Sequence, residues 1–132
     1  MGKMSFIRKN MTEENSQYRT EQLLCATILR EFYTSVKTEY KITNLLHDEL
    51  DVKQCQPDVV IENKNIAIRL NGPIHEKGKR PMKDEDQKIV LQANGWKVID
   101  LTPHNIPELW DQRKYTYEEA KNKLLGIIHA KM

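Results

Sequence analysis

The sequence lacks several features that mark whole classes of protein. Its longest largely apolar run, Leu23–Leu29, is far shorter than the ~20 residues of a membrane-spanning helix. No signal peptide precedes a small-residue cleavage site. Neither sign of charge dominates, with 21 Lys and Arg against 19 Asp and Glu, which excludes a polybasic binder. We therefore expect a soluble, intracellular protein without a membrane partner, whose contacts with nucleic acid would be local.

Cysteine is also scarce, with only two residues in the chain. Cys25 falls within a helical pattern and Cys55 within a polar segment that leads into a strand, and no CxxC spacing joins them. This argues against a structural zinc site and predicts two reduced thiols, one of them packed in the core.

The chain of 132 residues is long enough for one domain only. A chain of this size buries about two thirds of its surface around a single core, which excludes a two-domain enzyme with an interdomain cleft. We interpret residues 1–12 as a basic N-terminal arm and residues 13–132 as the domain.

Hydrophobic periodicity and breaker residues predict an α/β (α+β) domain in the order α-β-β-β-α-β-α, with a small mixed sheet flanked by helices. The predicted elements are a helix at 13–33, a strand at 34–42, an acidic loop at 44–56 with room for one helical turn, a hairpin of strands 57–62 and 66–71, a basic loop at 77–83, a helix at 83–94, a strand at 96–101 and a capping-box helix from Thr116 to about His129.

Two acids occupy unusual places. Glu21 projects with Cys25 and Ile28 in the apolar stripe of the first helix, where it either reaches out to solvent or is delivered to a polar site at the edge of the sheet. Asp58 opens the most β-prone segment, although Asp is depleted in strands. A turn on residues 63 and 64 sets Asp58 opposite Arg69, and a three-residue turn sets it opposite Leu70; a solvated strand end is the plainer alternative.

His75 follows the second hairpin strand and a Gly-Pro break, at the mouth of the basic loop. It can titrate near neutral pH, although a lone surface histidine is usually inert. The loop could guide a phosphate backbone, or it could be an ordinary solvated loop, since acids flank it on both sides. Its cations are Lys77, Lys79, Arg80 and Lys83.

These segments together carry a family signal. The run PDVVIENKNIAIRLNGPIHEK, then a helix beginning Lys83-Asp84, then Asn94-Gly-Trp-Lys-Val-Ile, resembles the very-short-patch-repair (Vsr)-like branch of the PD-(D/E)XK nuclease superfamily. The resemblance covers roughly residues 18–101 and implies a restriction-endonuclease-like core. It also implies a metal-dependent DNA endonuclease that uses Mg²⁺ or Mn²⁺.

Carried over by motif, the resemblance makes Asp58 the metal-binding aspartate and Glu21 the acid of the first helix that supports a metal or its water. His75 would lie near the scissile phosphate. Asp84 would be the helix acid, with Asp86 as a rival on the face of Ile89, Val90 and Ala93.

The chain departs from the family at the Glu-x-Lys (or Glu-x-Asp) position, where it has Arg69-Leu-Asn71. In one interpretation this is a nuclease of the EDxHD type, in which Arg69 grips phosphate, Asn71 offers an amide oxygen and a backbone carbonyl near Leu70 ligates metal. In the other the site is inactive and the fold binds nucleic acid. Pro107-Glu-Leu-Trp110 and the last helix resemble the end of a RAP domain, an RNA-associated relative.

The resemblance favours DNA over RNA as the partner, and a chain this small often needs a second copy to cut both strands, which makes a homodimer a further hypothesis. An unrelated small α/β domain remains the third alternative.

Overall fold

A computed structural model describes residues 20–72 and 80–132, with the side chains of residues 20 and 80–84 outside that description. Its elements occur in the predicted order, with one short helix added before the last. They are α2 (Thr20–Arg30), β1 (Val36–Thr38), β2 (Val59–Ile61), the 3-10 turn η2 (Glu62–Lys64), β3 (Ile66–Leu70), α3 (Arg80–Ala93), β4 (Lys97–Leu101), α4 (Pro107–Trp110) and α5 (Tyr117–Lys131).

The four strands form one mixed sheet in the order β1-β2-β3-β4. β2 pairs antiparallel with both β1 and β3, whereas β3 and β4 run parallel, with Arg69 level with Asp100. A parallel pair needs a crossover, and α3 supplies it between β3 and β4. The predicted mixed α/β class is therefore confirmed.

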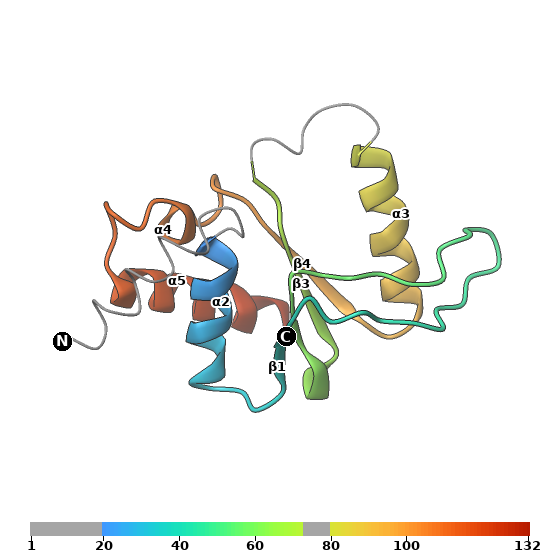
Figure 1. Cartoon of the computed structure of the whole chain (residues 1–132), viewed down its shortest axis with the longest axis horizontal. Coiled ribbons are helices and arrows are strands. Elements are labelled where there is room, and N and C mark those ends of the chain that lie inside the picture. Colours follow the sequence, from blue (N-terminus) through green and yellow to red (C-terminus); the bar gives the residue numbers. More distant parts are fainter. Residues whose placement is uncertain (1–19, 73–79) are drawn as a thin grey trace.

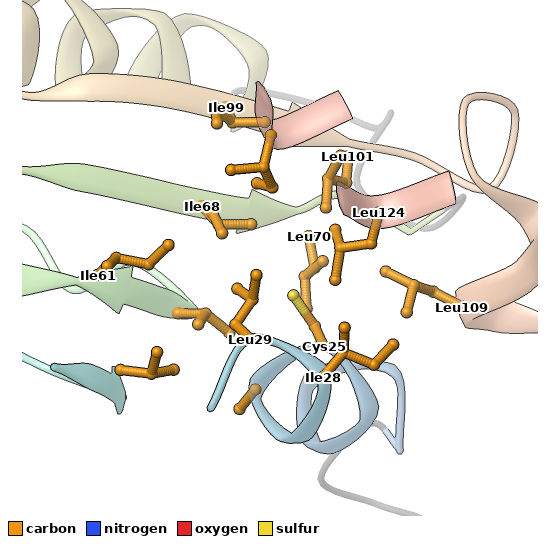
Figure 2. Packing of buried hydrophobic residues seen from close by; sticks show 14 of the residues in the cluster. Cys25, Ile28, Leu29, Ile61, Ile68, Leu70, Ile99, Leu101, Leu109 and Leu124 are labelled. Atoms are coloured by element: carbon orange, nitrogen blue, oxygen red, sulfur yellow. The ribbon is translucent and has the colours of Figure 1, made fainter. Parts of the chain in front are cut away.

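Helices cover both faces of the sheet. α2, α4 and α5 lie on one side and α3 on the other (Figure 1). Because strand side chains alternate, Ile66, Ile68 and Leu70 of β3 face the first group, while Ala67 faces the α3 layer. Figure 2 shows Cys25, Ile28 and Leu29 of α2 packed in the larger cluster with side chains of the strands and of α4 and α5. The prediction of a thiol packed in the core is confirmed for Cys25, and Cys55 is buried as well, with no disulfide between them.

The hairpin between β2 and β3 keeps the register that places Asp58 level with Arg69. Val59 pairs with Ile68, so one further step along each strand brings positions 58 and 69 together. The connection is η2 followed by Asn65, whose φ of 55° is left-handed, a conformation that Asn tolerates better than most residues. The loop is longer than a two-residue turn, but it joins the strands with the same register.

The segment at 44–56, predicted as an acidic loop with room for one helical turn, has no helix. It is the outer part of an extended excursion in which Ile42 bridges antiparallel to Cys55 and Leu45 N–H donates to the Lys53 carbonyl at 3.1 Å. Asn94, at the end of α3, fastens it: its Oδ1 accepts from Leu46 N–H at 3.1 Å and its Nδ2 donates to the Leu46 carbonyl at 2.8 Å. We call residues 40–57 the arm, as distinct from the N-terminal arm at residues 1–12.

Several predicted boundaries were wrong. The helix predicted to reach residue 33 ends at Arg30, and Phe32 is 51% exposed. The strand predicted at 34–42 ends at Thr38 because Glu39 has a φ of 53°, which a strand excludes. α3 starts at Arg80 and not at 83, so Arg80 and Lys83 belong to the helix and not to the basic loop. Pro81 is tolerated there because a first-turn N–H has no partner within the helix.

In the part of the chain that the structure describes, no helix is long and apolar enough to span a membrane. The N-terminal arm at 1–12 and the predicted helix start at 13–19 lie outside the described residues.

Candidate functional site

The strand directions bring two predicted site residues, Asp58 and Asn71, to one end of the sheet. Asp58 precedes β2, Asn71 follows β3, and β4 ends at Leu101. Because β2 is antiparallel to β3 and β4 is parallel to β3, the start of β2 lies at the same end of the sheet as the ends of β3 and β4. We call this end of the sheet the site edge.

Asp58 is held at the site edge by contacts of both its side chain and its backbone. Its Oδ2 accepts a hydrogen bond from Leu70 N–H at 2.7 Å, and its carbonyl accepts from Gln22 Nε2 at 2.8 Å. The carboxylate therefore ties the start of β2 to the end of β3. A loosely solvated strand end does not describe this geometry.

The polar residue that points inward from α2 is Gln22, which is only 5% exposed; Glu21 is half-buried. The sequence pattern had indicated Glu21, one residue earlier, and a 100° difference in helix phase separates the two. Glu21 lies in the first turn of α2, which the Gln22–Asp58 hydrogen bond places at the site edge. Sequence reasoning missed Gln22, although a hydrogen-bonding amide amid apolar neighbours was a signal.

Cys25 lies one turn further along α2 and is fully buried. Burial, reinforced by the nearby Asp58 carboxylate, raises the pKa of its thiol to about 12. The thiolate is the reactive form, so this cysteine is a packing residue and not a nucleophile.

Arg69 pairs with Asp100 of the neighbouring strand. Its Nε donates to Oδ1 at 2.6 Å and its Nη2 donates to Oδ2 at 3.0 Å, a two-point interaction between largely buried side chains that are 12% and 27% exposed. Lys88 of α3 lies 3.7 Å from the same carboxylate, and the Asn71 amide donates to it. Burial would raise the pKa of Asp100, but Arg69 together with Lys88 and Asn71 outweighs it, so the pKa is lowered.

The contact of Lys88 with Asp100 fixes the rotation of α3 against the sheet. Asp86 lies two residues before Lys88, about 160° around the helix, whereas position 84 lies one turn before Lys88 on the same side. Of the three residues predicted to share a face with Asp86, Ile89 and Ala93 are exposed and Val90 is fully buried. Helix phase thus favours position 84 as the neighbour of Lys88, and the choice between Asp84 and Asp86 stays a prediction.

The remaining predicted site residues fall in residues 73–79 and in the first turns of α3. His75, Lys77 and Lys79 lie outside the described residues, and Arg80, Lys83 and Asp84 are described only as positions in the first turns of α3. Among the described residues, no three His, Cys, Asp or Glu side chains form a group that could hold a metal ion.

Searches against protein families, curated proteins and solved structures found no match to this chain.

Proposed function

We propose that the chain has a restriction-endonuclease-like fold of the Vsr or EDxHD type and that it hydrolyses phosphodiester bonds in DNA with Mg²⁺ or Mn²⁺. One observation carries the proposal: Asp58, the end of β3 that leads toward His75, and the first turn of α2 meet at the site edge. Three sequence elements of the resemblance, distant along the chain, are thereby neighbours in space.

The donor chemistry at the site edge suits a hard cation. Asp58 supplies a carboxylate. In the proposal Glu21 would add a second from the first turn of α2, and strand-end carbonyls would add further oxygens, which are the ligands that Mg²⁺ prefers. The described residues alone do not complete a three-ligand group, so the proposal requires His75 or Asp84 as well. A cation bound there would polarise a phosphate oxygen and lower the pKa of a bound water.

The residues of the chain have separate roles in this proposal. Asp58 holds the cation with support from Glu21, and Leu70 N–H orients the Asp58 carboxylate. His75 exchanges a proton during attack, because its ordinary pKa lies near neutral pH. Arg69, which would repel a cation if it were unpaired, is neutralised by Asp100.

The test is cleavage of supercoiled and branched DNA with Mg²⁺ or Mn²⁺ by wild type, Asp58→Asn and His75→Ala. Asp58→Asn removes the charge but keeps an oxygen that can accept from Leu70 N–H. Asp51→Asn is the matched control, since Asp51 is an exposed acid on the arm. We expect cleavage by wild type and by the control, and at least 100-fold less by the other two variants. Equal activity in all four proteins, or none in any, would sink the proposal.

A second candidate function is nucleic-acid binding without cleavage, as in the RAP-like alternative. It is favoured by the two-point pair of Arg69 with Asp100, which puts a guanidinium where the superfamily has a carboxylate. This candidate predicts no cleavage, but retained DNA or RNA affinity in Asp58→Asn and loss of affinity when Lys79 and Arg80 are both replaced by Gln. Competition between DNA and RNA for the same protein would then identify the preferred ligand.

A further inference from the structure

The cluster around Asp100 carries more positive charge than the carboxylate can neutralise. Arg69 satisfies Asp100 with two hydrogen bonds, and the Asn71 amide provides a third. Lys88 adds a second cation to this single anion. These four side chains therefore sum to a net charge of about +1.

Lys88 is the accessible member of the two cations. Its side chain is 33% exposed, whereas that of Arg69 is 12% exposed. Its Nζ lies 3.7 Å from Asp100 Oδ2, which is an ion-pair distance but too long for a hydrogen bond. Among the described residues, Asp100 is the one carboxylate within ion-pair distance of this ammonium, whose three donors can therefore turn toward another anion.

Lys88 is placed so that a nucleic acid bound at the site edge would also lie within its reach. Lys88 and position 84 lie one turn apart on one side of α3, and Asp100 sits one residue before the end of β4. An anion that approached the ends of β3 and β4 from the α3 layer would meet Lys88 beside Asn71, whose amide shares the same carboxylate.

We propose that Lys88 binds a backbone phosphate of the nucleic acid, next to the phosphate held at the site edge. The inference rests on the proposed function and names a contact for it. Arg69 and Asp100 hold the ends of β3 and β4 together beneath this subsite. Asp100 keeps the Lys88 ammonium in place until a phosphate competes for the ammonium. Lys88 touches the ligand, whereas Asp100 is a positioning residue.

The experiment measures affinity for a fluorescein-labelled DNA duplex by anisotropy, in EDTA and over a series of salt concentrations. EDTA separates binding from cleavage. Lys88→Gln should reduce the slope of log affinity against log salt by about 0.9 and weaken binding about eightfold at ~0.1 M salt, because one phosphate contact is lost. Lys88→Arg should keep the wild-type slope. Lys64→Gln, the same charge change in η2 at the opposite end of the hairpin, is the control and should match wild type.

The outcomes separate this inference from the proposed function. If wild type binds DNA and Lys88→Gln gives the same slope as Lys64→Gln, the inference is overturned while the proposed function stands. If wild type shows no salt-dependent binding to DNA, both are overturned. Thermal unfolding midpoints within error of wild type for each variant would show that the change in slope reports binding and not loss of fold.

Discussion

The Arg69–Asp100 pair gives a prediction that can be worked out from its geometry. We would replace Arg69 by Met, which keeps an unbranched apolar stem, and Asp100 by Leu, each alone and both together. Either single change leaves a largely buried charge without its two-point partner. The double change removes both charges from the junction of β3 and β4. We therefore expect each single variant to lose stability and the double variant to lose much less than the sum.

The expected size of the coupling follows from burial and distance. A hydrogen bond to a charged group contributes about 1.5–3 kcal/mol, and this pair makes two, at 2.6 and 3.0 Å. Asp100 retains some exposure to solvent, which screens the interaction, so we expect a coupling free energy of about 2–3 kcal/mol. Lys88 and Asn71 also contact Asp100, but the double-mutant cycle subtracts their contributions from the pair.

The assay is urea unfolding of the four proteins, with the free energy of unfolding extrapolated to water. Lys37 and Glu62 provide the matched control cycle: their charged atoms are 2.7 Å apart, nearly the same distance, but both side chains are exposed to solvent. We expect a much smaller coupling there, since solvent screens an exposed pair. Equal couplings in the two cycles would show that burial does not strengthen the Arg69–Asp100 pair and would refute the inference that Asp100 fixes Arg69 in place.

Two further predictions concern acid and the arm. The pKa of Asp100 is lowered in the folded protein. The contribution of the Asp100 carboxylate to stability is therefore fully present above its ordinary pKa of 3.8 and is lost as the pH falls below that value. Between about pH 2 and 5, the free energy of unfolding should fall more steeply with acid in wild type than in Asp100→Asn. Asn94→Ala deletes the two hydrogen bonds to Leu46 and should destabilise the fold by about 1–2 kcal/mol. The arm should also become more sensitive to limited proteolysis. Unchanged cleavage of the arm by the protease would show that Asn94 does not hold it.

Local sequence signals correctly predicted where two of the helices begin or end. The capping box is confirmed, with Thr116 Oγ1 accepting from Glu119 N–H at 3.1 Å and Glu119 Oε1 accepting from Thr116 N–H at 2.8 Å. The helix stop at Asn94-Gly95 is confirmed as well, because Gly95 has a φ of 91° and Trp96 N–H closes the helix on the Leu91 carbonyl. Each of these signals needs only residues within one or two turns of one another.

Contacts between distant segments could not be predicted in the same way. Arg69 and Asp100 are level only because β3 and β4 pair in parallel through α3, and no local pattern specifies that register. The arm is held by Asn94, which follows it by some forty residues, so composition alone indicated a loop. Gln22 was missed although the apolar stripe of α2 was predicted with Cys25 and Ile28, both fully buried: the polar residue that shares their buried side is Gln22 and not Glu21.

The position of Asp100 changes what Arg69 implies for the proposed site. Taken from the sequence alone, an arginine at the Glu-x-Lys position puts a positive charge beside Asp58 and opposes a metal ion. In the fold, the guanidinium is paired with a carboxylate at hydrogen-bond distance, so at the site edge the two form a dipole whose field falls off faster with distance than that of a single charge. The pairing thereby reduces the repulsion that Arg69 itself would exert on a cation, although Lys88 leaves the cluster with a net positive charge. The question of catalysis passes to the residues that would complete the ligand set. His75 and Asp84 are therefore the decisive positions, and the loss of cleavage in His75→Ala, with DNA affinity unchanged, is the result that would separate a nuclease from a binding module.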